Sequence, residues 1–159
     1  METLVARASE GDRDDDPEVR VETAALMASV ARALILPPRL RDLLAHAAAL
    51  GGWAESASGR HALALAAAAD PTGRLLDLAR LIACAADEGE DAVEDVAERE
   101  AVVLLRVARD YAAARRRGGD TSQALAQAVG AAHADLDDAM RQALIGAGRG
   151  PAALGANPR

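Results

Sequence analysis

Apolar residues recur every three or four positions along most of the chain, the spacing of helices with one buried face. The first helix is expected to begin at Asp16-Pro17-Glu18, an N-cap followed by proline and an acid, and to bury Val19, Thr23, Leu26, Val30 and Leu34. Pro37-Pro38 ends it because neither proline can donate the next helical hydrogen bond.

The remaining helix-start and helix-stop signals predict further helices of the same kind. Proline and glycine pairs, Asp-Pro and Gly-Gly-Asp mark the boundaries, since these residues cap or stop helices. Trp53 is expected to close one end of the folded core. The predicted segments are 38–50, the second half of 53–70, a helix from the Asp70-Pro71-Thr72 start to 86, about 91–117 and 121 to about 144.

Composition favours the same fold class. Half of the residues are hydrophobic, but the chain has no Phe and only one Trp and one Tyr, so alanine and leucine, the strongest helix formers, must supply the core. We therefore predict an all-α, mostly antiparallel bundle of five to six helices forming a single domain over 1–159. Its ordered core is expected at about 16–146, with a flexible acidic N-terminus and a Gly/Pro-rich C-terminal tail.

Alanine-rich stripes bury little area per helix, because a buried Ala contributes only a fraction of the roughly 1.5–3 kcal/mol of a buried Leu. We therefore expect the chain to gain stability by pairing with another copy or with a protein partner. Homo-oligomerisation is the prediction.

Charge and cysteine content limit the environment and partners. The net charge is −7, which opposes binding to phosphate backbones, and every basic side chain is Arg, as is typical of GC-rich bacterial genomes. One cysteine, Cys84, cannot form an intramolecular disulfide. The longest apolar run, 62–69, is too short for a membrane span, and no secretory segment is visible. A soluble cytoplasmic protein is expected.

The segment 91–117 has acids at its start and arginines in its later half. This arrangement complements a helix dipole, which is its simplest explanation, but it would also suit an oppositely charged partner. The candidate partner-binding residues are Glu94, Asp95, Glu98, Arg109, Arg115, Arg116 and Arg117.

Residues 121–144 resemble the DNA-binding helix-turn-helix motif. Ala126 stands where the motif has a small residue, Gly130 falls at the turn, and Leu125, Val129, Leu136 and Ala139 match its buried positions. The resemblance implies nucleic-acid contacts from His133 and Arg141. However, the aspartates at 135, 137 and 138 would face the phosphates and repel them. One long helix with an interior glycine, or a plain helical hairpin, is the alternative.

No pattern predicts catalysis, a cofactor or a metal. His46, His61 and His133 lack the spacing of helical metal sites, and Cys84 has no evident base. The acidic clusters 12–16 and 87–100 lack the order of calcium loops. We therefore predict a non-enzymatic protein–protein interaction module such as an adaptor, assembly subunit or chaperone-like accessory protein. A helix-turn-helix transcriptional regulator and a helical bundle that binds a small molecule or cofactor are the alternatives.

Overall fold

The computed structural model describes residues 16–86, 93, 95–132 and 134–149, and within these residues the secondary structure is entirely helical. The predicted acidic N-terminus and most of the predicted tail lie outside them. The described part contains seven α-helices and one 3₁₀ helix: α2 (Pro17–Ala33), α3 (Pro38–Leu50), η1 (Gly51–Glu55), α4 (Ala57–Ala68), α5 (Arg74–Ala86), α6 (Val96–Arg116), α7 (Thr121–Ala131) and α8 (Asp138–Gly148).

The helix ends follow from local capping chemistry. The side chain of Asp16 accepts a hydrogen bond from the backbone N–H of Glu18 at the start of α2. Pro38 opens α3, as expected from a proline in the first turn. After α2, Ile35 adopts a φ of 56°, a left-handed conformation in which the chain turns toward α3.

The number of α-helices in the described part exceeds the predicted five to six, because the last predicted segment forms two helices. α7 ends at Ala131, and the side chain of Asp137 caps a new helix by accepting from the backbone N–H of Met140 at 2.7 Å. Of the alternatives for this segment, the single long helix is therefore wrong, and two helices joined by a short connection are found. Local competition between a cap and helix propagation is the physical reason.

Two other predicted starts are displaced. The side chain of Asp70 does accept from the backbone N–H of Leu75, but α5 begins only at Arg74, after Gly73 has turned the chain at a φ of 72°. The described helix α6 begins at Val96 instead of about 91, because the side chain of Asp95 caps it by accepting from the N–H of Glu98.

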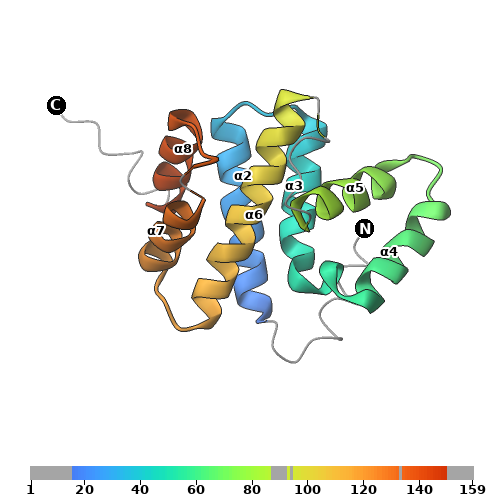
Figure 1. Cartoon of the computed structure of the whole chain (residues 1–159), viewed down its shortest axis with the longest axis horizontal. Coiled ribbons are helices and arrows are strands. Elements are labelled where there is room, and N and C mark those ends of the chain that lie inside the picture. Colours follow the sequence, from blue (N-terminus) through green and yellow to red (C-terminus); the bar gives the residue numbers. More distant parts are fainter. Residues whose placement is uncertain (1–15, 87–92, 94, 133, 150–159) are drawn as a thin grey trace.

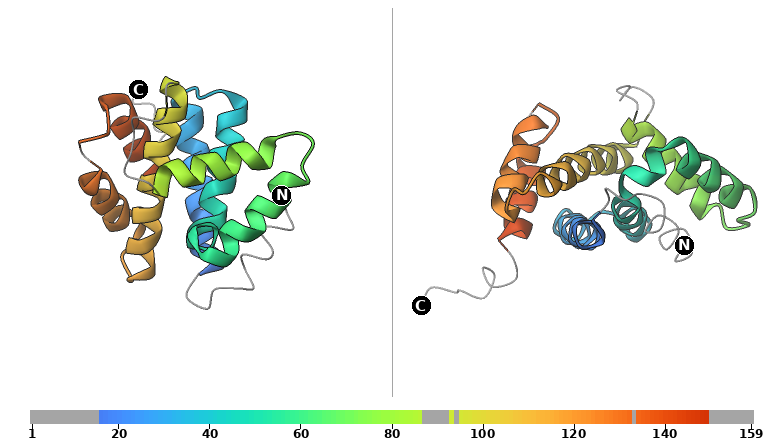
Figure 2. Two further views of the ribbon diagram at one scale, coloured as in Figure 1. Left: turned by 45° about the vertical axis from the view of Figure 1, so that its right-hand side comes forward. Right: turned by 90° about the horizontal axis from the view of Figure 1, so that it is seen from below.

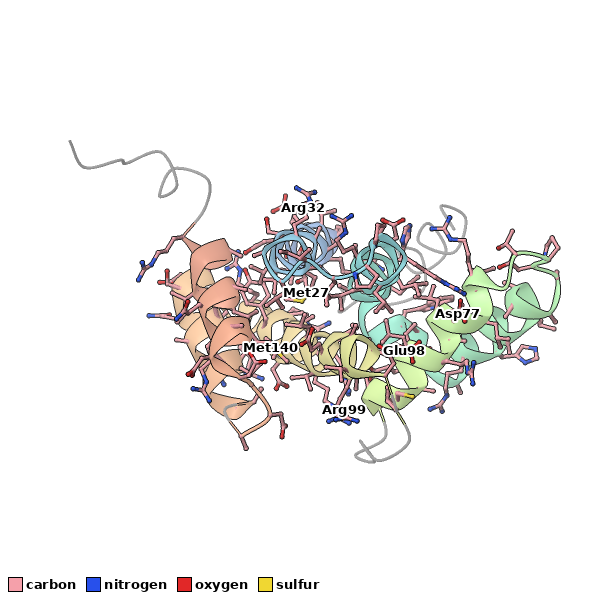
Figure 3. The ribbon with its side chains drawn as sticks, turned by 90° about the horizontal axis from the view of Figure 1, so that it is seen from above. Met27, Arg32, Asp77, Glu98, Arg99 and Met140 are labelled. Carbon is pink, nitrogen blue, oxygen red and sulfur yellow. The ribbon has the colours of Figure 1, made fainter. Side chains whose placement is uncertain are left out.

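α2, α3 and α6 form the centre of the molecule, with α7 and α8 on one side and α4 and α5 on the other (Figure 1, Figure 2). Met27 is fully buried and points from α2 toward α6, whereas Arg32 extends from the outer side of α2 (Figure 3). Trp53 is buried in η1, as predicted. The expected positions Val19, Leu26 and Val30 are buried as well.

Candidate functional site

The arginines in the second half of α6 occupy three different environments. Arg115 is partly buried and held against α2 by Glu22, to which its Nε and Nη2 donate at 3.1 and 2.9 Å. Its Nη1 also donates to the backbone carbonyl of Gly119 at 2.7 Å. Arg115 therefore joins α2 to the end of α6, and its guanidinium is engaged within the chain.

Glu22 is the centre of a network that the sequence analysis missed. Besides Arg115, the hydroxyl of the fully buried Tyr111 donates to its carboxylate, and Thr121 Oγ1 donates at 3.1 Å. The hydrogen bond from Arg115 holds the pKa of Glu22 below its ordinary value. Burial, together with the hydrogen bond to Glu22, raises the pKa of Tyr111 to about 12. We call Glu22, Tyr111, Arg115 and Thr121 the Glu22 network.

Arg109 connects α6 to α5 and η1. Its Nη1 donates to the backbone carbonyl of Ala85 at 3.0 Å, and its Nε lies 2.8 Å from a carboxylate oxygen of Glu55. The neighbouring Arg106 donates to the carbonyls of Cys84 and Ala85. These bonds satisfy carbonyls that are orphaned where α5 ends, so both guanidinium groups act as C-terminal caps.

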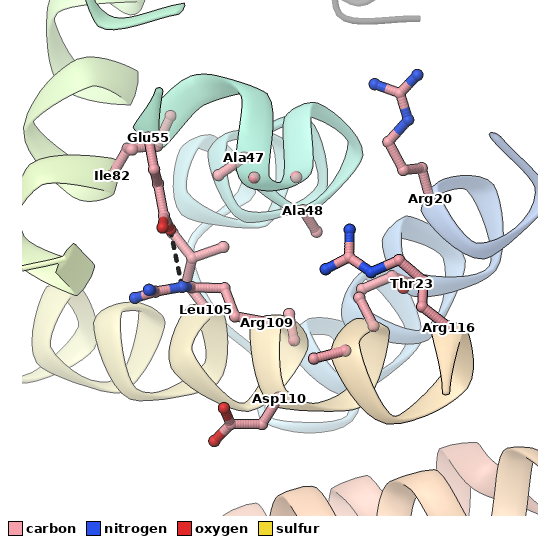
Figure 4. Close-up of a pocket in the computed structure, with 15 residues that line it drawn as sticks. Arg20, Thr23, Ala47, Ala48, Glu55, Ile82, Leu105, Arg109, Asp110 and Arg116 are labelled. Atoms are coloured by element: carbon pink, nitrogen blue, oxygen red, sulfur yellow. Dashed lines mark ion pairs between the residues drawn. The ribbon is translucent and has the colours of Figure 1, made fainter. Parts of the chain in front are cut away.

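Arg116 and Arg117 are both exposed, and Arg116 lines a cavity. This cavity has a volume of about 250 Å³ and lies where α2, α3, η1 and α6 meet. Figure 4 shows Arg116 reaching from α6 toward α2, with the ion pair between Arg109 and Glu55 farther along α6. Arg20 and Thr23 of α2 contribute the opposite wall.

Small residues form the rest of this wall, including Ala47, Ala48, Gly51 and Gly52. We call this site, lined by Arg20, Arg109 and Arg116 together with these small residues, the arginine pocket.

The acidic candidates lie at the other end of α6. Glu94 is outside the described residues. Asp95 is exposed and caps α6, and Glu98 is exposed beside a second cavity that Arg80 and Cys84 also line. A helix of 21 residues is roughly 30 Å long, so the structure does not bring Asp95 and Glu98 together with Arg115–117.

α7 and α8 place the residues of the helix-turn-helix resemblance as follows. Gly130 lies within the last turn of α7, not between the helices, and both it and Ala126 are exposed. Arg141 donates to Asp138 at 3.0 Å and to the carbonyl of Leu136 at 2.8 Å. His133 lies outside the described residues. Recognition of DNA by this segment stays a prediction.

An exposed apolar surface lies on α4 and α5, which contact one another on one side of the molecule (Figure 1). A groove of about 370 Å³ runs between them. Its walls are Ala54, Glu55, Arg60, Leu63 and Ala64 on one side and Ala79, Ile82, Ala83 and Ala86 on the other. We call this the α4–α5 groove. Leu65 of α4 and Leu76 of α5 are 61% and 53% exposed.

In the sequence, the long run of apolar residues at 62–69 is the feature that corresponds to this surface. The run predicts a helix and is too short for a membrane span, but a sequence does not show which apolar face of a helix lacks a neighbour.

Comparison with protein-family models, with curated proteins and with solved structures gives no match. Within the part of the chain that the structure describes, no three His, Cys, Asp or Glu side chains come together as a metal site. Across the same residues, none of the helices has both the length and the apolar character needed to span a bilayer.

Proposed function

We propose that this chain is a non-enzymatic, cytoplasmic interaction module, folded as one mostly antiparallel helical bundle, that self-associates through the α4–α5 groove. One observation carries the proposal. α4 has the sequence ASGRHALALAAA, yet of its twelve residues only Gly59 and Leu63 are buried. An apolar helix with so little cover has a face available for another chain.

The energetics of α4 support this proposal. A helix of about a dozen residues is marginal in water and depends on tertiary packing. α4 packs against α5 and η1, and its remaining sides carry the exposed Ala64, Leu65 and Ala68. Covering the exposed parts of Leu65 and Leu76 would stabilise an assembly by about 1 kcal/mol each.

The groove also suits a second copy of the same chain. Its small alanine side chains allow two helix pairs to approach closely. Glu55 and Arg60, of opposite charge, both line it. In a two-fold arrangement the same patch meets itself, so the groove of one copy can pack against the groove of the other. The net charge of −7 makes two copies repel each other at long range. Salt screens this repulsion, so the association becomes stronger at higher salt.

Sedimentation equilibrium of the parent chain and of single glutamate variants tests the proposal. Leu76→Glu and Ala83→Glu each place a charge on the exposed α4–α5 surface and should shift the parent's dimer to monomer. Val21→Glu is the matched control, because Val21 is 70% exposed on α2, outside the groove. The proposal fails if the parent sediments as one chain, or if all three variants weaken association equally.

A further inference from the structure

Arg109 of α6 bonds to both walls of the α4–α5 groove. Its Nε lies 2.8 Å from a carboxylate oxygen of Glu55, which belongs to η1 and lines one side of the groove. Its Nη1 donates at 3.0 Å to the backbone carbonyl of Ala85, whose neighbour Ala86 lines the other side. Arg109 itself lines the arginine pocket rather than the groove. A single guanidinium group on a third helix therefore joins the two walls.

The ion pair between Arg109 and Glu55 lies at the boundary of the two cavities. Glu55 and Ile82 line both the arginine pocket and the α4–α5 groove. Figure 4 shows Glu55 extending from η1 toward α6, where it meets Arg109. The side chains of Arg109 and Glu55 are 40% and 25% exposed, so water weakens their attraction without removing it. Because the guanidinium is planar with several fixed donors, it can engage the carboxylate and the carbonyl at once.

The position of α4 depends on how η1 is held. α4 packs mainly against α5 and η1, and η1 in turn contacts α3, α5 and α6. Figure 1 shows α4 on the outer side of the molecule. A short helix with such limited packing can move at a low cost in free energy. A bond that fixes η1 to α6 keeps the groove in shape before a second copy arrives, and this lowers the ordering cost of association.

We propose that Arg109 is the positioning residue of the self-association site, because it holds η1 and the end of α5 in the arrangement that a second copy meets. The inference rests on the function proposed for the α4–α5 groove. Arg109 does not itself contact the second copy. It acts through Glu55 and the carbonyl of Ala85, so its replacement changes the groove from outside.

Sedimentation equilibrium of full-length variants tests the inference. Arg109→Gln should lower the association constant about fivefold, because the walls of the groove lose their common bond. Arg106→Gln is the matched control. It removes the same charge one turn earlier in α6, and Arg106 donates to the same carbonyl of Ala85, but the ion pair with Glu55 belongs to Arg109. The control should change the association constant by less than about twofold.

Glu55→Gln isolates the contribution of the ion pair. Arg109→Gln and Glu55→Gln break the same pair, so the two changes combined should weaken association no more than Arg109→Gln alone. Urea unfolding of each variant shows that it is folded and measures any loss of stability separately from the loss of association.

Trp53 reports on η1 independently of association. It is the one tryptophan of the chain, is buried, and lies two residues before Glu55 in η1. At a protein concentration low enough for a monomer, Arg109→Gln should shift its fluorescence emission to longer wavelength, because η1 is released from α6 and Trp53 meets more water. Arg106→Gln should leave the emission unchanged. An unchanged emission in Arg109→Gln would contradict the positioning of η1.

The sedimentation results separate this inference from the function on which it rests. If the parent is a dimer that Leu76→Glu dissociates, the groove stands as the interface. In that case, equal effects of Arg109→Gln and Arg106→Gln on association, or additive effects of Arg109→Gln and Glu55→Gln, would overturn the role of Arg109 alone. A parent that sediments as one chain would overturn the proposed function and this inference together.

Discussion

Replacing Glu22 by Ala tests how much of the tertiary structure depends on the Glu22 network. The change removes the carboxylate that accepts from Tyr111, Arg115 and Thr121 at once, and so loosens the contact of α2 with α6 and the start of α7. Because Ala has high helix propensity, α2 itself is not weakened. Any loss of stability therefore comes from the donors left behind.

The magnitude follows from the burial of each donor. Tyr111 has no exposed surface, and a buried hydroxyl without an acceptor costs about 1–3 kcal/mol. Arg115, with 26% of its side chain exposed, keeps the carbonyl of Gly119 and loses about 1 kcal/mol of a partly solvated ion pair. Thr121 is less buried and is rehydrated. The sum is about 2–4 kcal/mol, or roughly a thirty- to thousandfold change in the unfolding constant.

Urea unfolding followed by circular dichroism measures this loss, with Glu18→Ala as the control. Glu18 is an exposed acid one turn earlier in α2, and its removal should cost less than about 1 kcal/mol. Adding Tyr111→Phe to Glu22→Ala removes the unsatisfied hydroxyl and should recover about 1 kcal/mol or more of the free energy of unfolding. Removing both partners of a buried hydrogen bond costs less than removing one, because no polar group is left without a partner.

The reasoning is refuted if Glu22→Ala is no more destabilising than Glu18→Ala, or if Tyr111→Phe lowers the stability of the Glu22→Ala variant further. The pH dependence provides a second check. The pKa of Glu22 is lowered by folding, so its contribution is present above its ordinary pKa of 4.5 and is lost as the pH falls through the lower, folded value. The difference in stability between the parent and the Glu22→Ala variant should therefore become smaller in acid.

Four further measurements probe other features of the fold. Ile35→Gly should stabilise the protein by about 1 kcal/mol in urea unfolding, because Ile35 is 86% exposed and has a φ of 56°, which is unfavourable for a β-branched residue. Gly59→Ala should destabilise it by about 2 kcal/mol or more, since the new Cβ would lie 1.9 Å from the carbonyl oxygen of Trp53. Gly130→Ala, in an open helical position, should instead be neutral or stabilising by up to about 1 kcal/mol. Ultraviolet titration of Tyr111, the one tyrosine of the chain, should show a pKa near 12, and stability should be undiminished below pH 10 and fall as the pH rises from 10 to 12. Ionisation of Tyr111 at pH 10 in the folded protein would contradict the buried, hydrogen-bonded environment of its hydroxyl.

The helical fold class could be predicted from the sequence because the forces that decide it are local. A helix cap acts over two or three residues, as Asp16, Asp95 and Asp120 show, and apolar spacing identifies the buried side of a helix. The boundary between α7 and α8 was harder, because in that region an aspartate cap and an alanine-rich helix compete over the same few residues.

The candidate site depended on contacts that the sequence does not reveal. Arg115 and its neighbours looked like one basic patch, but Arg115 meets Glu22, which is 93 positions away, whereas Arg116 faces a cavity and Arg117 lines none of the cavities described. Likewise, the apolar pattern of α4 shows that this helix has faces to bury without showing that it packs against α5 and η1. Helix propensity and capping act between near neighbours in the chain, and the sequence determines them. Which guanidinium finds a carboxylate, and which apolar face is left exposed, depends on how distant helices pack, and only the tertiary structure decides that.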